Sequence, residues 1–157
     1  MNNADAFEKA QSMALSFLAR RRLTASELKE RLEKKGFGAD ECDKAVEYFT
    51  EMGYINDFDY SERFIIDAVE LKRHGKARIR RDLIFKGIDS ETIEAAFLSC
   101  KTDDLQTLSL LVEERLQKLD ISSEKARNSF VGFLIRKGFR FDEINTVLRE
   151  RDVEYFD

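Results

Sequence analysis

Hydrophobic residues recur along the chain at the spacing of an amphipathic helix. Over residues 5–21, Phe7, Ala10, Ala14 and Phe17 fall three or four positions apart. Residues with this spacing lie on one face of an α-helix, so they can pack against a core together. Over residues 39–52, Cys42, Ala45, Val46 and Phe49 follow the same rule and are expected to point inward.

The pattern repeats at a fixed offset of 51 residues. Lys-Gly followed by a large apolar residue occurs at 35–37, 86–88 and 137–139. Four apolar columns keep the same offset without gaps: Leu28, Ile79 and Phe130; Leu32, Leu83 and Leu134; Cys42, Ile93 and Ile144; Ala45, Ala96 and Val147. Self-similarity of this kind predicts a tandem array of one structural unit.

Cap and turn residues divide each unit into three helices. Thr24 to Glu27 has the spacing of a capping box, and Gly36 suits the left-handed turn that ends a helix. The expected helices cover about 5–21, 24–36, 39–52, 57–74, 76–86, 89–100, 103–119, 122–138 and 142–151. We therefore predict an all-α, elongated tandem array of three helix-turn-helix-like repeats, with boundaries at 1–55, 56–102 and 103–157.

The composition agrees with an all-α fold. The 157 residues include no proline and only seven glycines, although the turns of a sheet draw on both. The chain is 43% hydrophobic, enough to bury a core, and 37% charged, which favours helices with large polar faces. We expect neither a signal peptide nor a transmembrane helix. We expect Cys42 and Cys100 to be reduced, unpaired thiols.

Few residues suit catalysis or metal binding. The single histidine, His74, precedes Gly75 at a predicted helix end, so we expect it at the surface or complementing the helix dipole. No glycine-rich phosphate loop is present, and the many carboxylates suit caps, first turns and solvated faces. The sequence therefore predicts a protein that is not an enzyme and that has no metal and no cofactor.

Positive charge is concentrated in residues 72–86, although the whole chain has a net charge of −4. On a helical wheel Ile79 and Leu83 face inward, whereas Arg78, Arg81 and Phe85 form a stripe on the roughly opposite, exposed side. Asp82 is the single acid of this segment. The candidate partner-binding or nucleic-acid-binding residues are Lys72, Arg73, Lys76, Arg78, Arg80, Arg81 and Lys86.

The repeat provides an internal control for Arg78 and Arg81. The equivalent residues are Glu27 and Glu30 in the first unit, and Ser129 and Gly132 in the third. The apolar columns persist while the charge changes, so maintenance of the fold does not explain the two arginines. Two interpretations stay open: a solvated helix face, or a surface that binds phosphate or an acidic protein groove.

Three stretches form a set of motifs in a fixed order. They are "LARRRLTASELKERLEKKGF" at 18–37, "GYINDFDYSERFI" at 53–65 and "HGKARIRRDLIFKGI" at 74–88. Together they resemble the RecX family, regulators of the bacterial recombinase RecA. Asn56 and Ser61 depart mildly from the usual family residues. Lys76 stands where the family typically has proline, which adds charge and gives up rigidity at a helix start.

The resemblance implies a cytoplasmic, monomeric regulator without membrane contact. Such a protein would bind RecA and RecA–single-stranded DNA filaments, lie along the filament groove, and mostly inhibit recombinase and ATPase activity in DNA repair, recombination and the SOS response. One alternative is a stand-alone helix-turn-helix-like module that binds nucleic acid without RecA, with residues 76–86 as the recognition helix. A helical scaffold with neither activity is the third possibility.

Overall fold

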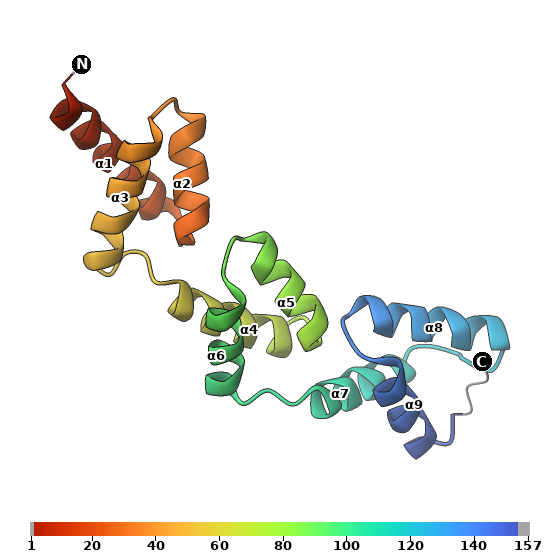
Figure 1. Ribbon diagram of the computed structural model, residues 1–157. Helices are drawn as coiled ribbons and strands as arrows, with labels where there is room; N and C mark the ends of the chain where they lie inside the picture. The colour runs from red at the N-terminus through yellow and green to blue at the C-terminus, as the bar shows by residue number, and fades with distance from the viewer. Residues whose placement is uncertain (1, 154–157) are drawn as a thin grey trace. The chain divides into compact units, whose positions relative to one another are not determined.

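The computed structural model describes residues 2–153, and these residues form nine α-helices and no strand (Figure 1). The helices are α1 (Asn3–Arg20), α2 (Ala25–Lys34), α3 (Ala39–Glu51), α4 (Asp57–Glu70), α5 (Lys76–Phe85), α6 (Ser90–Cys100), α7 (Asp104–Leu116), α8 (Glu124–Arg136) and α9 (Phe141–Glu150). The all-α prediction is confirmed. None of the described helices is both long enough and apolar enough to span a bilayer.

The chain divides into two compact units, and helices α4, α5 and α6 are split between them. One unit contains the residues up to Arg63 together with Leu83–Ala96, and the other contains Phe64–Asp82 together with the residues from Phe97 onward. The predicted boundaries at 1–55, 56–102 and 103–157 stay a prediction. Residue 1 and residues 154–157 of that division lie outside the described residues.

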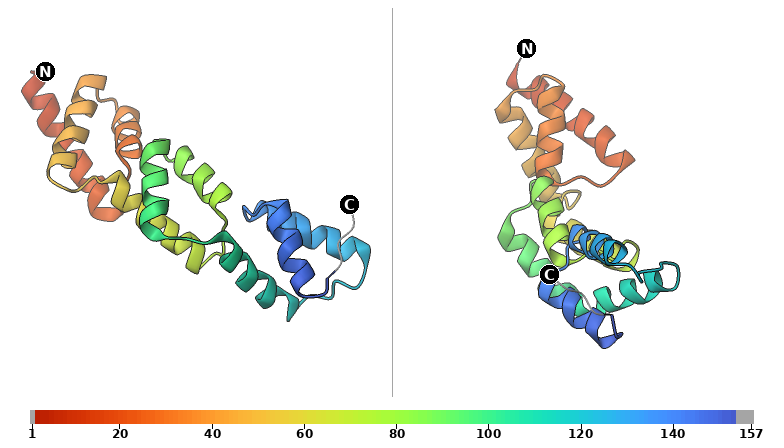
Figure 2. Two further views of the ribbon diagram at one scale, coloured as in Figure 1. Left: turned by 60° about the horizontal axis from the view of Figure 1, so that its bottom comes forward. Right: turned by 90° about the vertical axis from the view of Figure 1, so that its right-hand side faces the viewer.

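In the first unit, α1, α2 and α3 pack together around an apolar core (Figure 1). The fully buried side chains of this core include Ala10, Ala14, Leu28, Leu32, Cys42 and Ala45. In the second unit, α9 packs against both α7 and α8 (Figure 2). Its buried core includes Leu108, Val112, Leu134, Ile144, Val147 and Leu148.

The 51-residue repeat is visible as one turn geometry that occurs after α2, α5 and α8. Gly36, Gly87 and Gly138 have φ values of 96°, 86° and 105°, the left-handed conformation that glycine adopts most readily. The residue after each glycine donates its N–H to the carbonyl of a leucine in the last turn of the helix. These bonds join Phe37 to Leu32 at 3.2 Å, Ile88 to Leu83 at 3.2 Å, and Phe139 to Leu134 at 3.3 Å.

The predicted apolar columns are buried in all three repeats. Leu32, Leu83 and Leu134 are each fully buried, and Ile79 and Ile93 are as well. Most predicted helix ends lie within two residues of the observed ones. Helix α4 is an exception, because it ends at Glu70 and the chain then turns back with Arg73 at φ 55°.

Candidate binding site at the start of helix α5

The segment before α5 is held tightly despite its basic composition. The His74 N–H donates to the Ala68 carbonyl at 2.9 Å, which closes the end of α4. The first N–H of α5, on Lys76, donates to both carboxylate oxygens of Asp104 at 3.1 and 3.2 Å. A carboxylate of α7 therefore caps the positive N-terminal end of α5. Burial raises the pKa of Asp104.

Two glycines allow the start of α5 to approach the turn after α8. The Gly75 N–H donates to the Lys137 carbonyl at 2.8 Å. A Cβ atom on Gly75 would overlap the Gly138 carbonyl. A Cβ atom on Gly138 would lie 2.8 Å from the backbone nitrogen of Arg78. Because real Cβ atoms do not approach other atoms this closely, glycine is required at Gly75 for this contact. We call this region the α5 junction, which comprises Lys72, Gly75, Lys76, Arg78, Asp104, Lys137 and Gly138.

Several positive side chains meet at the α5 junction. The Lys137 ammonium donates to the Lys72 carbonyl at 3.1 Å, and the Arg78 guanidinium donates to the Arg136 carbonyl at 3.3 Å. Burial lowers the pKa of Lys137, and the positive charges of Arg78, Arg115 and Lys72 lower it further. Arg115 and Lys137 both lie over the Phe133 ring, at 4.5 and 5.5 Å from its centre.

His74 is buried in the same region, which contradicts the prediction of a surface or dipole-complementing residue. Its side chain is 6% exposed, and its Nδ1 atom has no hydrogen-bond partner among the described residues. Burial lowers the pKa of His74 to about 4, with further contributions from the neighbouring cations Arg78, Lys137 and Lys72. The imidazole is therefore neutral near pH 7. The prediction was wrong because the chain next to His74 packs against the turn after α8, where Gly75 bonds to Lys137, and the sequence pattern does not reveal this packing.

A contact of the same design occurs at the start of α2, within the first unit. The Ala25 N–H donates to the Asp57 carboxylate at 2.9 Å, as Lys76 does to Asp104. The Thr24 hydroxyl donates to the Lys86 carbonyl at 2.8 Å, and a Cβ atom on Gly87 would overlap the Ser26 side chain. We call this region the α2 junction, which comprises Arg21, Thr24, Ala25, Ser26, Glu27, Asp57, Lys86 and Gly87.

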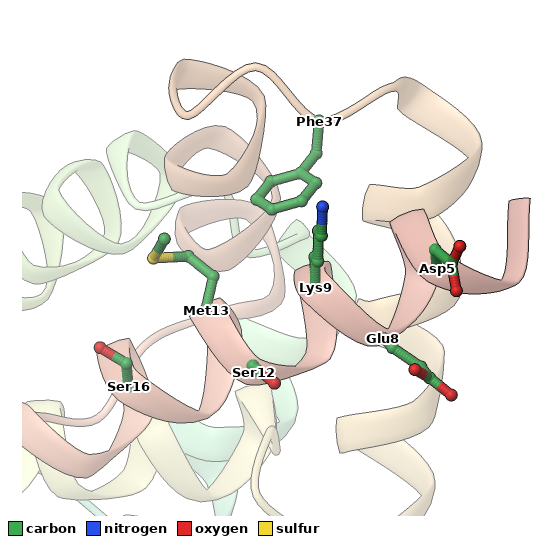
Figure 3. Close-up of a pocket in the computed structure, with 7 residues that line it drawn as sticks. All are labelled: Asp5, Glu8, Lys9, Ser12, Met13, Ser16 and Phe37. Carbon is green, nitrogen blue, oxygen red and sulfur yellow. The ribbon is translucent and has the colours of Figure 1, made fainter. Parts of the chain in front are cut away.

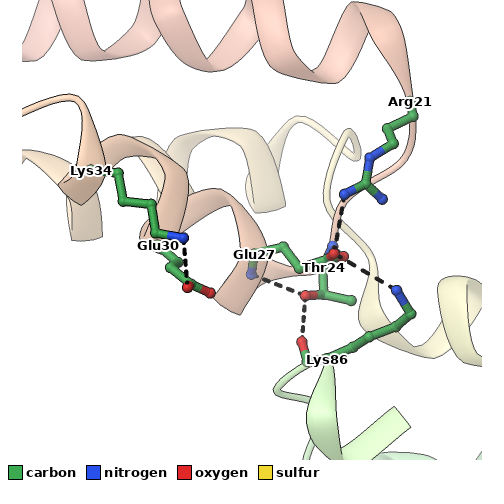
Figure 4. A network of polar contacts seen from close by, with 6 residues as sticks. All are labelled: Arg21, Thr24, Glu27, Glu30, Lys34 and Lys86. Carbon is green, nitrogen blue, oxygen red and sulfur yellow. Dashed lines mark hydrogen bonds and ion pairs between the residues drawn. The ribbon is translucent and has the colours of Figure 1, made fainter. Parts of the chain in front are cut away.

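The predicted capping box of α2 is present in the α2 junction. The Glu27 N–H donates to the Thr24 hydroxyl, and the Thr24 N–H donates to the Glu27 carboxylate, both at 3.1 Å. The same carboxylate lies between two cations, 3.4 Å from Arg21 and 3.8 Å from Lys86 (Figure 4). This carboxylate therefore neutralises positive charge where the turn after α5 meets α2.

The two junctions have equivalent positions but different charges. Arg21, Glu27 and Lys86 of the α2 junction correspond, at the offset of 51, to Lys72, Arg78 and Lys137 of the α5 junction. The central carboxylate of the first set is an arginine in the second. The α5 junction thus holds cations together where the α2 junction holds an ion-paired cluster.

The structure separates the seven predicted basic residues. Six lie in the second unit, and Lys86 lies in the first, where it contacts Glu27 and the Tyr60 ring. Arg73 pairs with Glu114 at 2.8 Å, and Arg80 lies 5.2 Å from the centre of the Phe97 ring.

Arg78 and Arg81 do not form the uniformly exposed stripe that was predicted. Arg81 is exposed and has no ion pair within the described residues. The Arg78 side chain is 35% exposed, because the turn at Gly138 packs against it. The prediction was therefore right for Arg81 and wrong for Arg78. A binding role for any of the seven residues stays a prediction.

Sequence reasoning missed Asp104, Arg115 and Lys137 as members of this site. The offset of 51 residues contained a usable signal, since it pairs Lys137 with Lys86 and Arg78 with Glu27. The sequence did not show that the turn after α8 contacts the start of α5, or that the turn after α5 contacts the start of α2.

The remaining surface has an open groove along α1. Its volume is about 680 Å³, and the residues lining it include Lys9, Met13 and Phe37. In Figure 3, Lys9 extends toward the Phe37 ring, whereas Asp5 and Glu8 point away from it. Acidic and basic groups therefore do not converge there. Within residues 2–153, no group of three or more His, Cys, Asp or Glu side chains could hold a metal ion, and both cysteines are free.

The fold and this site define an all-α protein built from three-helix, helix-turn-helix-like units. Two family models match the chain: "RecX, first three-helix domain" over residues 10–49 and "RecX, second three-helix domain" over residues 56–96. Together they cover just over half of the sequence. The chain belongs to the RecX family, as the motifs predicted.

Known relatives and a solved structure agree with this assignment. "Regulatory protein RecX" of Clostridium botulinum (strain Eklund 17B / Type B) is 28% identical over 152 residues, which covers 94% of this chain and 71% of that protein. "Regulatory protein RecX" of Vibrio vulnificus (strain CMCP6) is 28% identical over 137 residues, covering 87% and 89%. The crystal structure of RecX from Lactobacillus salivarius matches with a TM-score of 0.79 and 25% identity, covering 95% of this chain and 98% of that one.

Proposed function

We propose that this protein is a non-enzymatic, cytoplasmic regulator of the bacterial recombinase RecA. It binds RecA and RecA–single-stranded DNA filaments and lowers their recombinase and ATPase activity during DNA repair and recombination. The observation that carries this proposal is the match of both three-helix domains to a family whose members are named regulatory proteins.

The chemistry of the described residues supports a binding role. A general base works best with a pKa near the operating pH, whereas His74 has a pKa of about 4 and is buried. The α5 junction instead offers fixed positive groups, which suit the recognition of phosphate or carboxylate.

The alternative of a stand-alone helix-turn-helix module is less well supported. In such modules the N-terminal residues of the recognition helix contact base edges in the major groove. Here that end of α5 is covered, because Gly75 contacts Lys137, Lys76 contacts Asp104 and Arg78 contacts Arg136. These contacts cover the backbone at the helix start, which a recognition helix would place in the major groove.

The test is the ATPase rate of RecA on single-stranded DNA during titration with this protein. We expect the rate to fall when the protein is well below one copy per RecA. In parallel, binding to the same DNA without RecA is measured near physiological salt. Tight binding to bare DNA with no effect on the RecA rate would support the stand-alone module and contradict the proposal.

A further inference from the structure

We propose that Lys72, Arg78 and Lys137 form a binding site for backbone phosphates of a single-stranded nucleic acid. The inference deepens the proposed function and rests on it, because it assigns the DNA contact of the regulator to one place. The site lies at the α5 junction, within the second unit, and includes Lys137, which lies far along the sequence from the basic segment 72–86.

The first argument is that the fold does not require this arrangement of charges. The α2 junction has the same backbone contacts and places Glu27 between Arg21 and Lys86. At the equivalent place, the α5 junction has Arg78, and the positive charges of Arg78 and Lys72 both lower the pKa of Lys137. The stable packing of a junction is therefore compatible with a carboxylate at its centre. An external anion would supply the charge that Glu27 supplies at the α2 junction.

The second argument is that Arg78 and Lys137 are held in place and have donors left to offer. The Lys137 ammonium uses one hydrogen for the Lys72 carbonyl, and Arg78 uses part of its guanidinium for the Arg136 carbonyl. A lysine has three donors and an arginine has five, so both can bind an anion as well. Because their positions are already fixed, less conformational entropy is lost when the anion binds.

The third argument concerns the amount of charge. Asp82 lies 3.9 Å from the Arg78 guanidinium and offsets part of the positive charge. Arg115 contributes further positive charge, since it shares the Phe133 ring with Lys137. Four cations, Lys72, Arg78, Lys137 and Arg115, thus stand against Asp82, while the Asp104 carboxylate of the junction caps the Lys76 N–H. A nucleic-acid strand brings one negative charge with each nucleotide, whereas one protein carboxylate would neutralise only a single cation.

The test compares two charge reversals on α5. Arg78→Glu places a carboxylate where Glu27 lies in the α2 junction, between Lys72 and Lys137, so we expect a melting temperature within about 3 °C of the parent. Arg81→Glu is the matched control, with the same charge change one turn away on an exposed position. Both proteins and the parent are titrated into a fluorescently labelled oligothymidylate, without RecA, at several salt concentrations.

We expect Arg78→Glu to weaken oligothymidylate binding about tenfold or more. The slope of the logarithm of the binding constant against the logarithm of the salt concentration should become shallower by about one or two. Arg81→Glu should weaken oligothymidylate binding by only about threefold, because it changes only the long-range electrostatic attraction between the protein and the DNA. Equal losses for the two variants would overturn the site. So would polyglutamate competing as well as unlabelled oligothymidylate, which would indicate an acidic protein partner instead.

The RecA ATPase titration separates this inference from the proposed function. If the parent protein lowers the RecA rate but Arg78→Glu binds oligothymidylate as the parent does, only the phosphate site is overturned. If the parent binds oligothymidylate through Arg78 but leaves the RecA rate unchanged, the regulation of RecA is overturned and the phosphate site stands.

Discussion

Single residues decide how closely the segments of this protein meet. Gly75 is buried, and its N–H reaches the Lys137 carbonyl because no side chain intervenes. The backbone conformation of Gly75 is not what demands glycine, since no left-handed φ occurs there. Glycine is needed at position 75 because the Gly138 carbonyl occupies the space that a Cβ atom would fill.

We expect Gly75→Ala to lower the free energy of unfolding by about 1–3 kcal/mol, as overpacking of a tight contact does. Gly132→Ala is the control, because its added Cβ would meet only the flexible Arg136 side chain at 3.3 Å within α8. That change should instead raise stability by about 0.5–1 kcal/mol. Urea unfolding measures both, and a neutral Gly75→Ala would contradict the close contact.

His74 should make stability depend on pH. Its pKa is about 4 in the folded chain and about 6.5 in the unfolded one, so the unfolded chain takes up a proton first as the pH falls. The stability that the neutral imidazole contributes is complete above about pH 6.5 and is lost toward pH 4, by up to about 3 kcal/mol.

The variant His74→Gln isolates this effect. It keeps the surrounding Lys72, Arg78, Lys137 and Asp82, so their titration cancels in the comparison. The parent should lose stability relative to the variant as the pH is lowered from 7 to 4.5. Parallel pH profiles in urea unfolding would show that His74 titrates normally and is not buried.

At this scale the sequence predicted burial well and contacts poorly. The offset of 51 residues identified Leu32, Leu83 and Leu134 as one buried column, because large apolar residues that recur at helical spacing form the face that packs against a core. It did not reveal the environment of His74, which depends on a turn more than sixty residues away in the sequence. Side-chain type and spacing alone contain no information about such a contact.

At the scale of elements, helices α2 and α5 both begin under the turn that follows another helix. Asp57 and Asp104 cap the two helix starts from outside, at Ala25 and Lys76. The capping box of α2 was predictable because Thr24 and Glu27 have a recognised local spacing. The bond from the Thr24 hydroxyl to the Lys86 carbonyl was not, because Lys86 is distant in sequence.

Thr24→Val should cost about 2–4 kcal/mol of unfolding free energy. It removes the cap on the Glu27 N–H, and it leaves the half-buried Lys86 carbonyl without the hydroxyl donor that the fully buried Thr24 supplies. Ser123→Ala is a matched control that removes only a cap, the bond from the Ala126 N–H in α8, and should cost about 1 kcal/mol. Equal costs in urea unfolding would mean that the Lys86 contact contributes nothing.

At the scale of the whole molecule, the charge of the chain and the charge of the candidate site have opposite signs. A net charge of −4 opposes general binding to nucleic acid, so the proposed phosphate contact has to rest on a local patch. The sequence located the basic segment 72–86 and predicted that Arg78 and Arg81 within it share one exposed helix face. The structure divides that segment between ion pairs, aromatic contacts and the α5 junction.

This division changes how the arginines should be tested. A combined reversal of Arg78 and Arg81 would mix a half-buried junction residue with a freely exposed one. Testing them singly separates a specific site from the general field of the helix. Arg78 and Arg81 differ in the proposed role, although both are arginines on the same helix, three positions apart.

The most direct measurement is the RecA ATPase rate on single-stranded DNA, titrated with the parent, Arg78→Glu and Arg81→Glu at the same salt concentration. The parent should halve the rate at well below one copy per RecA, and Arg81→Glu should need only slightly more. Arg78→Glu should need about tenfold more, with its melting temperature preserved. If the parent leaves the rate unchanged, regulation of RecA is contradicted, and if Arg78→Glu inhibits as strongly as the parent, the α5 junction is not the regulatory surface.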